Sequence, residues 1–459
     1  MTKDERKRAS KMRGKRDILL KIMKLMVPFW NIMIFAYVWA LYYNERTTPE
    51  FWKQNMVISL FLYLIVYIAF GKLYNAFKIG TYKISELVFS QLLSFGIADL
   101  CLYLECCLLH HGMIQLIPGI AAVIVQLFGS MLLITIAKRY FARYIPPQKT
   151  LLVYGAARTD TEEFADKLKG KFSHMIQIEE MASQEQGEEA LLRKIDNFGT
   201  ILLYQVDEQV RVKLLAEGIQ RDKTIYITPR IEDILLTNFE NRHIIDTPLL
   251  KAKTESSDYF GKRVLDILIS GVMLCIFSPF MLIVALAIKL EDGGPVFYKQ
   301  KRVTKGGKTF DILKFRSMIQ DAEAKGYQPC TTGDPRITKT GHIIRATRLD
   351  ELPQLINILK GDMSVVGPRP ERVEHVEKYT AQLPEFAYRL RVRGGLTGYA
   401  QIYGKYNTSA EDKLKMDLMY IERQSLLLDL QLIFLTVKIM FIPESTEGFK
   451  KEDVEKKSE

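Results

Sequence analysis

The chain has 459 residues, 48% of them hydrophobic, and its 64 Lys and Arg against 53 Asp and Glu give a formal net charge of +11. Two or three domains are expected at this length. The basic charge combined with long apolar segments favours anionic lipid over nucleic acid as a partner. The five cysteines show neither zinc-ligand spacing nor the pattern of a secreted disulfide framework.

Four apolar segments follow a basic arm at residues 1–24. Most are long enough to cross a hydrocarbon core, which takes roughly 20 helical residues. Basic residues flank alternate connections, so the positive-inside rule predicts a four-helix transmembrane bundle with both ends in the cytoplasm. The bundle is expected over residues 25–147, with its segments near 25–43, 56–70, 84–109 and 113–137.

Two acidic residues, Asp99 and Glu105, fall inside the third apolar segment. Ionisable groups are costly within a membrane and often functional there. The sequence leaves three interpretations open: a role in transport or lipid binding, a buried pair, or a position close to a membrane face.

Residues 148–250 alternate strand-like runs with helical patterns, which is typical of a small parallel α/β domain. The first run ends at Gly155 and is followed by Ala156, Ala157 and Arg158. A dinucleotide site of the G-x-G-x-x-G type needs several glycines for its tight turn and close phosphate approach. We therefore expect a degenerate Rossmann-like domain with a regulatory or assembly role rather than an NAD site.

The apolar run 264–290 is interrupted at its centre by Ser278-Pro279. Proline removes a backbone hydrogen bond and kinks a helix, and an adjacent serine helps to satisfy the freed groups. Cations flank both ends of the run, and a full crossing would separate the arginine-rich last third from the face where the preceding segments leave the chain. We predict a reentrant helix that enters one leaflet and returns, with a fifth, kinked transmembrane helix as the alternative.

A β-hairpin is expected next, because two strand-like runs flank the turn Gly306-Gly307. Lys314 and Arg316 would then share one strand face with Ile312, which is unusual unless an anion is bound there.

Arginines also gather beside a glycine-rich turn further along the chain. Arg389, Arg391 and Arg393 lie directly before Gly394-Gly395. Backbone N–H groups in such a turn are suited to holding a phosphate or facing a nucleobase. The glycines alone are weak support for an anion site, and the three arginines strengthen it.

The stretch 345–370 carries two adjacent carboxylates, Asp350 and Glu351, at the predicted start of a short helix. Pro353 fits a first helical turn, and Lys360-Gly361 predicts the end of the helix. A carboxylate is stabilised at a helix N-terminus, where free N–H groups also attract phosphate. The pair fits either phosphoryl chemistry or a capped surface helix, and the arginines nearby in sequence are Arg345, Arg348 and Arg369.

The segment 426–441 is too short and polar to span a membrane comfortably, since it contains Asp429, Gln431 and Lys438. An amphipathic helix in the membrane plane is predicted instead. A charged tail at 446–459 follows.

Several of these motifs occur together and in one order. In this respect residues 255–445 resemble the large bacterial polyprenyl-phosphate phosphoglycosyl transferases of the monotopic superfamily, which initiate capsule, exopolysaccharide and O-antigen synthesis. The resemblance rests on the Ser-Pro break and on Gly-Pro-Val-Phe-Tyr-Lys-Gln-Lys-Arg, Lys-Phe-Arg-Ser-Met, Leu-Asp-Glu-Leu-Pro-Gln, Gly-Asp-Met-Ser-Val-Val-Gly-Pro-Arg-Pro and Gly-Leu-Thr-Gly-Tyr-Ala-Gln. It implies a multidomain membrane protein in which residues 251–445 form an α+β monotopic catalytic domain with a reentrant helix at 264–290.

The resemblance further implies transfer of a phospho-sugar from a UDP-sugar to polyprenyl (undecaprenyl) phosphate at the cytoplasmic face of the bacterial inner membrane, with release of UMP. Asp350 would be the nucleophile that forms an aspartyl-phosphosugar intermediate, and a ligand of Mg²⁺, with Glu351 as its partner. The basic positions of the family fall on Lys314, Arg316, Arg345, Arg369 and Arg393. A carboxylate agrees with this role because it attacks phosphorus without first losing a proton at neutral pH.

Two other classes of function stay open on the sequence. One is a transporter or flippase of lipid-linked sugars that uses the bundle, and it requires function to survive Asp350→Asn. The other is a binding or scaffold protein regulated through residues 148–250, and it predicts no UMP release from any UDP-sugar. The sequence fixes neither the sugar nor the oligomeric state.

Overall fold

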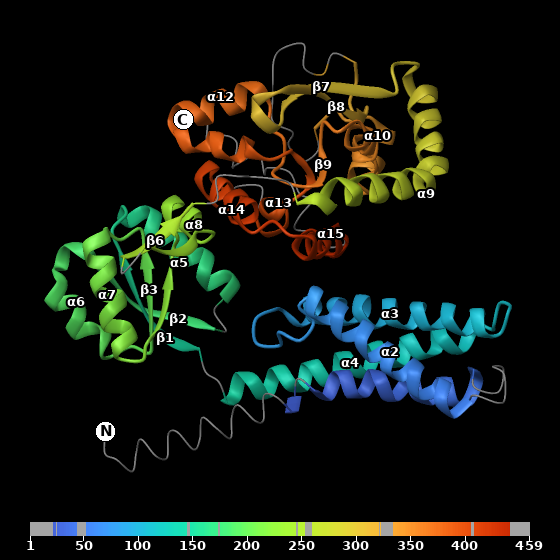
Figure 1. Cartoon of the computed structure of the whole chain (residues 1–459), viewed down its shortest axis with the longest axis horizontal. Helices are drawn as coiled ribbons and strands as arrows, with labels where there is room; N and C mark the ends of the chain where they lie inside the picture. Colours follow the sequence, from blue (N-terminus) through green and yellow to red (C-terminus); the bar gives the residue numbers. More distant parts are fainter. Residues whose placement is uncertain are drawn as a thin grey trace. The chain divides into compact units, whose positions relative to one another are not determined.

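The chain forms two compact units, Met1–Thr228 and Pro229–Glu459 (Figure 1). Most of the predicted basic arm and all of the predicted charged tail lie outside the residues that are described. The structure is a computed structural model that describes residues 22–23, 25–43, 52–144, 147–172, 175–244, 247–252, 259–320, 322, 334–404 and 408–440.

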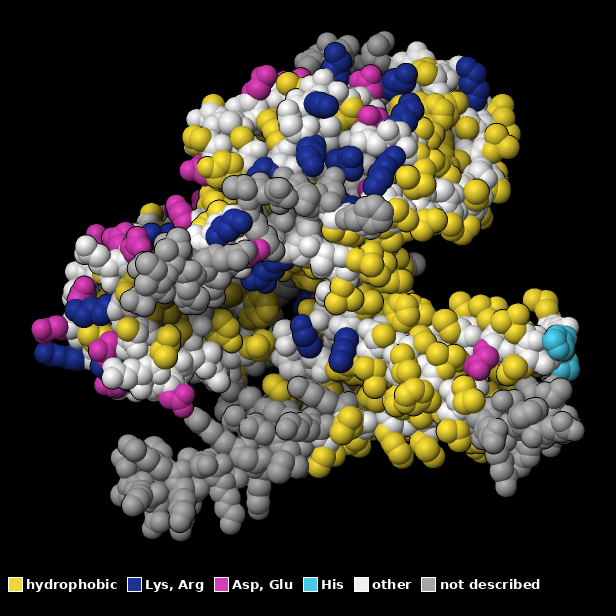
Figure 2. Space-filling view, viewed as in Figure 1, with side chains coloured by type: hydrophobic (Ala, Val, Ile, Leu, Met, Phe, Trp, Pro, Cys, Tyr) yellow, Lys and Arg dark blue, Asp and Glu magenta, His cyan; other side chains and the backbone are white. Residues whose placement is uncertain are grey.

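Apolar helices dominate the described start of the first unit. Five helical segments of the described chain are long and apolar enough to cross a membrane, four of them here and the fifth in the second unit. Large apolar side chains point outward from these helices, and Figure 2 shows them over much of the surface. The prediction of several apolar helices is confirmed, and the four of the first unit are Leu25–Tyr43, which ends in the π-helical η1 (Trp39–Tyr43), α2 (Trp52–Leu73), α3 (Ile84–Leu109) and α4 (Ile117–Tyr144).

Polar side chains are buried between these helices. Gln126 Nε2 lies 3.1 Å from Tyr63 Oη and 3.4 Å from Asp99 Oδ1, and Ser59 donates to Glu105 Oε1 over 3.2 Å. Asp99 and Glu105 of α3 therefore each contact a polar group on a neighbouring helix, Gln126 of α4 and Ser59 of α2.

A four-stranded parallel sheet forms the rest of the first unit, as predicted. Its order is β2-β1-β3-β4. Leu151 and Leu152 of β1 point into different hydrophobic clusters, so helices cover both faces of the sheet. The elements are β1 (Gln148–Tyr154), α5 (Arg158–Phe172), β2 (Ile176–Ser183), η4 (Gln184–Gln186), α6 (Glu188–Ile195), β3 (Thr200–Tyr204), α7 (Glu208–Gln220) and β4 (Thr224–Ile227).

The single glycine after β1 is required by packing. A Cβ on Gly155 would lie 2.5 Å from Gln205 O and 2.7 Å from Gln184 Oε1. The Gln184 side chain is held there because its Nε2 donates to Asp207 Oδ2 over 2.7 Å and its Oε1 accepts from Asp207 N over 2.9 Å. At this carboxyl edge of the sheet the turn packs against a protein side chain.

The second unit combines short sheets with helices and contains the predicted hairpin. Strands β7 and β8 pair antiparallel, whereas the short strands β9 and β10 pair parallel. The elements are α8 (Ile231–Leu236), β5 (Glu240–Ile244), β6 (Thr247–Lys251), α9 (Phe260–Asp292), β7 (Phe297–Val303), η5 (Lys305–Gly307), β8 (Thr309–Phe315), α10 (Lys339–Ala346), η6 (Leu349–Glu351), α11 (Gln354–Lys360), β9 (Ser364–Val366), α12 (Val373–Gln382), η7 (Pro384–Arg391), β10 (Gly395–Thr397), α13 (Tyr399–Tyr403), α14 (Ala410–Glu422) and α15 (Leu426–Met440).

The core of this unit surrounds α11. Leu355 and Ile358 of α11 pack with Val366 of β9 and Leu418 of α14. Ile234 of α8 joins the same core, which explains why the unit begins before residue 251.

Helix α9 is 33 residues long and contains Pro279, and Figure 1 shows it sharply bent. Pro279 has no N–H to donate to the carbonyl four residues earlier, which belongs to Cys275. The Ser278 hydroxyl donates to that carbonyl over 3.0 Å. The bend is therefore stable without an unsatisfied backbone oxygen, and the large apolar side chains around it, including Ile276, Phe280 and Leu282, are exposed.

Candidate active site

The two carboxylates lie in a 3₁₀ turn between two α-helices. Helix α10 ends at Ala346, and Arg348 then adopts a left-handed conformation (φ 56°, ψ 18°), which is uncommon for a residue with a side chain. The chain reverses there into η6, which contains Asp350 and Glu351. Pro353 precedes the first residue of α11, so the single predicted helix is observed as a 3₁₀ turn followed by an α-helix.

Glu351 is held by two cations. Its Oε1 accepts from Lys314 Nζ over 2.9 Å and from Arg369 Nη2 over 2.8 Å. Burial alone would raise the pKa of Glu351, but these two cations hold the pKa well below its usual range. Glu351 is therefore ionised near neutral pH, and it ties β8 to the loop that follows β9.

Asp350 is in a different environment. Among the described residues none donates a hydrogen bond to its carboxylate, and burial raises its pKa. Lys314, Arg345 and Arg369 oppose that rise, whereas Glu351 reinforces it. The two adjacent carboxylates are thus unequal: the first is available to a ligand, and the second is bound by protein cations.

Arg345 is the third cation near this pair. It lies in the last turn of α10 and acts electrostatically on Asp350. Within the described part of the chain its guanidinium makes no hydrogen bond or ion pair, so its five donors are available to an anion.

Arg316 lies apart from the carboxylates. It follows β8, is 7% exposed, and its Nη1 donates to Asp292 Oδ2 at the end of α9 over 2.7 Å. Its Nη2 pairs with the other oxygen of Asp292, which makes the contact bidentate. A Cβ on Gly294 would lie 2.7 Å from Arg316 Nη1, so a side chain there would displace the guanidinium.

The glycine-rich turn near Arg393 is occupied by the fold itself. Gly394 N donates to Thr304 Oγ1 over 3.2 Å, and Gly395 N donates to Pro368 O over 2.8 Å. A Cβ on Gly367 would lie 2.4 Å from Arg393 O, so these main chains are in close contact. The expectation that the N–H groups of Gly394 and Gly395 hold a phosphate is therefore wrong.

Two of the three arginines expected to act together, Arg389 and Arg391, are directed to different partners. Arg389 is 5% exposed, pairs with Asp417 over 2.8 Å and donates to the carbonyl of Arg369 over 2.8 Å. Arg391 pairs with Glu422 over 2.7 Å. Arg389 therefore supports the main chain of a residue that contacts Glu351.

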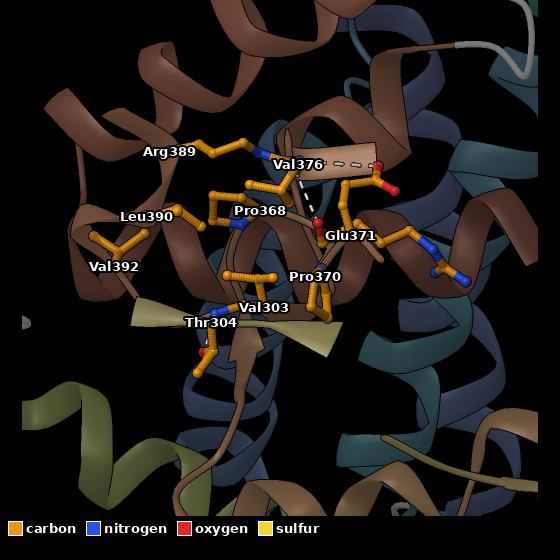
Figure 3. Close-up of a pocket in the computed structure, with 11 residues that line it drawn as sticks. Val303, Thr304, Pro368, Pro370, Glu371, Val376, Arg389, Leu390 and Val392 are labelled. Atoms are coloured by element: carbon orange, nitrogen blue, oxygen red, sulfur yellow. Dashed lines mark hydrogen bonds and ion pairs between the residues drawn. The ribbon is translucent and has the colours of Figure 1, made fainter. Parts of the chain in front are cut away.

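Arg369 is among the residues that line a small pocket, which no sequence pattern predicts. Figure 3 shows Arg389 directed toward Glu371 across it, with Val303 and Pro370 on the opposite wall. The Arg389–Glu371 ion pair measures 3.9 Å, and Arg302 Nη1 also lies 3.9 Å from Glu371. Only the folded structure reveals this cluster, since Arg302 and Arg389, which both face Glu371, are 87 positions apart along the chain.

The environments of Asp350 and Glu351 also determine which of them can bind a metal ion. In the described part of the chain no group of three or more His, Cys, Asp or Glu side chains is placed to hold a metal ion. Mg²⁺ at phosphate sites is usually bound by one or two carboxylates together with substrate phosphates and water. Asp350 fits such a shared site because its carboxylate receives no hydrogen bond from the described residues, whereas Glu351 Oε1 already accepts from two cations.

Comparison with known proteins identifies relatives of the second unit. A family profile described as bacterial sugar transferase matches residues 257–443. The chain is 41% identical over 217 residues to a UDP-N-acetylgalactosamine-undecaprenyl-phosphate N-acetylgalactosaminephosphotransferase of Aeromonas hydrophila, covering 47% of this chain and 51% of that protein. It is 42% identical over 181 residues to a UDP-glucose:undecaprenyl-phosphate glucose-1-phosphate transferase of Caulobacter vibrioides, covering 38% and 68%. It is 37% identical over 192 residues to the exopolysaccharide production protein ExoY of Rhizobium meliloti, covering 39% and 84%. The match thus spans about half of the Aeromonas protein.

Proposed function

This chain belongs to the bacterial sugar transferase family, and we propose that it transfers a phospho-sugar from a UDP-sugar to polyprenyl phosphate, giving polyprenyl-diphosphate-sugar and UMP. The names of the Aeromonas and Caulobacter relatives combine a UDP-sugar with undecaprenyl phosphate. Because the Rhizobium relative is named as an exopolysaccharide production protein, we also propose that the reaction initiates the synthesis of a polysaccharide, such as an exopolysaccharide or a capsule.

The observation that carries this proposal is the inequality of Asp350 and Glu351. An oxygen of Asp350 attacks the β-phosphorus of the UDP-sugar, the bond from that phosphorus to the bridging oxygen breaks, and UMP leaves with the bonding electrons. An oxygen of polyprenyl phosphate then attacks the same phosphorus, and the Asp350 carboxylate is released. Asp350 needs no general base for the first step, because it is a carboxylate rather than an alcohol.

Positive charge exceeds negative charge around the reacting carboxylate. Lys314, Arg345 and Arg369 face Asp350 and Glu351, so three cations oppose two anions. This surplus suits a diphosphate, whose charge must be neutralised before an anionic nucleophile approaches. We assign to Glu351 the role of holding Lys314 and Arg369 in place. Mg²⁺ held by Asp350 and the substrate phosphates would add further neutralisation of the diphosphate.

The chain is a membrane protein with several apolar helices, and we propose that α9 is reentrant. A straight helix of 33 residues would be about 50 Å long. Yet Lys262 near its start contacts Val366, and Asp292 at its end contacts Arg316, both within the second unit. Attachment of both ends to one unit, with exposed apolar side chains at the bend, supports entry into one leaflet and return.

The remaining membrane topology follows from the same proposal. The four apolar helices of the first unit would form a bundle with both ends in the cytoplasm, and α15 would lie in the membrane plane. Buried Asp429 and Lys438 face the protein, whereas exposed Leu427 and Met440 suit lipid. The catalytic unit then lies on the cytoplasmic face, where UDP-sugars are found and where the lipid phosphate emerges.

Release of UMP tests the proposal. The full chain in nanodiscs is mixed with a panel of UDP-sugars and undecaprenyl phosphate, and UMP should form with at least one sugar and disappear in Asp350→Asn. With UDP-sugar alone, the protein should gain the mass of a phospho-sugar and release about one UMP. UMP that appears only with the lipid phosphate contradicts the covalent step. Activity that survives Asp350→Asn, or no UMP from any UDP-sugar, contradicts the transferase.

A further inference from the structure

Glu351 depends on two cations that come from separate elements. Lys314 belongs to β8, and Arg369 follows β9. Both elements are separate from the 3₁₀ turn η6, which carries the carboxylates. Other contacts must therefore fix the distance between Lys314 and Arg369. The ends of α9 provide such contacts.

The C-terminal end of α9 is fixed next to Lys314. Asp292 pairs with Arg316, two positions after Lys314, and Asp292 Oδ1 also accepts from Gly294 N over 3.1 Å. The preceding residue, Glu291, accepts from the N–H groups of Lys339 and Thr340 at the start of α10 over 2.8 and 3.2 Å. This end of α9 therefore orients both the strand with Lys314 and the helix with Arg345.

The N-terminal end of α9 is fixed next to Arg369. Asp266 Oδ1 accepts from Val365 N over 2.8 Å and from Ser364 Oγ over 2.9 Å, both in β9. Lys262 donates from Nζ to Val366 O over 2.9 Å and to Asp429 Oδ2 over 2.7 Å. Val366 is three positions before Arg369, so this end orients the loop that carries the second cation.

We propose that the two ends of α9 act as clamps that position Lys314 and Arg369 around Glu351, with Asp292, Arg316, Lys262 and Asp266 as positioning residues of the active site. The inference rests on the proposed function. It gives the charged residues at the two ends of α9 a role in the active site, in addition to any role in attaching the helix to the membrane. Lys262 and Asp429 are each 1% exposed. Replacement of such a buried ion pair by apolar residues is often neutral or stabilising, so its value here lies in geometry.

The test compares the rate of UMP release in nanodiscs for variants at each clamp. Asp292→Ala removes the first clamp, and the exchanged pair D292R/R316D restores an ion pair of opposite polarity. Asp266→Ala removes the acceptor at β9, whereas Asp266→Asn keeps an oxygen in the same place. Glu422→Gln is the matched control, because Glu422 is 6% exposed and forms its ion pair with Arg391 of η7 rather than with a residue of α9.

We expect Asp292→Ala and Asp266→Ala to lower kcat by roughly tenfold to a hundredfold, since small misplacements of catalytic groups have effects of that size. The KM for UDP-sugar should change by no more than about twofold, and D292R/R316D and Asp266→Asn should recover most of the rate.

Clamp variants that keep wild-type kcat overturn the inference, and so does a loss of rate that D292R/R316D and Asp266→Asn do not recover. A change in thermal stability with no change in kcat also overturns it, because it indicates a structural role alone. Failure of the wild type to release UMP contradicts the proposed function instead, so the two failures are distinguishable.

Discussion

Lys314→Met is a direct test of how Glu351 contributes to turnover. Lys314 Nζ lies 2.9 Å from Glu351 Oε1, and the two side chains are 19% and 17% exposed. A hydrogen bond to a charged group contributes about 1.5–3 kcal/mol. A factor of ten in rate corresponds to about 1.4 kcal/mol of transition-state stabilisation. If this contact serves to hold the cations around the diphosphate, kcat/KM should fall by about 10- to 150-fold.

The assay measures initial UMP release in nanodiscs over a range of UDP-sugar concentrations and pH. After burial, Lys314 has the largest effect on the pKa of both Asp350 and Glu351 and lowers each of them, so its loss raises both pKa values and moves the acidic limb of kcat/KM to higher pH. The same sign applies to stability. A carboxyl whose pKa is lowered in the folded protein stabilises it above the unfolded pKa, and this stabilisation is lost as the pH falls through the folded pKa. Lys314→Met should therefore lower Tm more at neutral pH than in acid.

Lys299→Met is the control, since Lys299 is an exposed lysine on the partner strand of the same hairpin, paired in register with Leu313. It should leave kcat/KM and the acidic limb unchanged. The reasoning about Glu351 is refuted if Lys314→Met retains kcat/KM within about threefold of the wild type, or lowers it with no movement of the acidic limb.

Three further predictions concern topology, packing and metal. A cysteine at Lys299 in a cysteine-free background should react with an impermeant maleimide only from the cytoplasmic side, and labelling from outside alone contradicts the reentrant α9. Gly155→Ala should destabilise the first unit by about 1–3 kcal/mol, because its Cβ meets Gln205 O at 2.5 Å, and an unchanged thermal transition would show that the turn relaxes freely. Chelation with EDTA should reduce UMP release, and Mg²⁺ should restore it through the proposed site at Asp350; activity that is indifferent to EDTA excludes that site.

Features that depend on neighbouring residues were predictable from the sequence. Lys360-Gly361 predicted the end of a helix, and α11 ends there with Gly361 at φ 96°. Gly306-Gly307 predicted a hairpin turn, and both glycines have positive φ. The adjacent carboxylates and the Ser278-Pro279 break were likewise visible as local patterns.

Pairings across long separations were not predictable in the same way. Arg316 was expected to bind phosphate, and in the structure it forms an ion pair with Asp292 at the end of α9. Strand periodicity does not reveal which acidic residue approaches a given arginine. Arg389 and Arg391 differ for the same reason, since η7 directs them to Asp417 and Glu422 on different turns of α14. The unequal environments of Asp350 and Glu351 also arise only from folding, because Lys314 is 37 residues away from Glu351.

The hydrogen bond of the Ser278 hydroxyl determines whether the bend of α9 needs a water molecule. In a water-soluble protein, a carbonyl freed by proline is commonly hydrated. In α9 the serine donates to that carbonyl itself, so the corner needs no water molecule. A bend without bound water is compatible with the hydrocarbon region of a membrane, where each unsatisfied backbone group costs several kcal/mol. In the proposed reentrant arrangement, the attachment of both ends of α9 to the second unit limits how deeply the helix enters the bilayer. A change of bilayer thickness should then strain those attachments before it changes the bend.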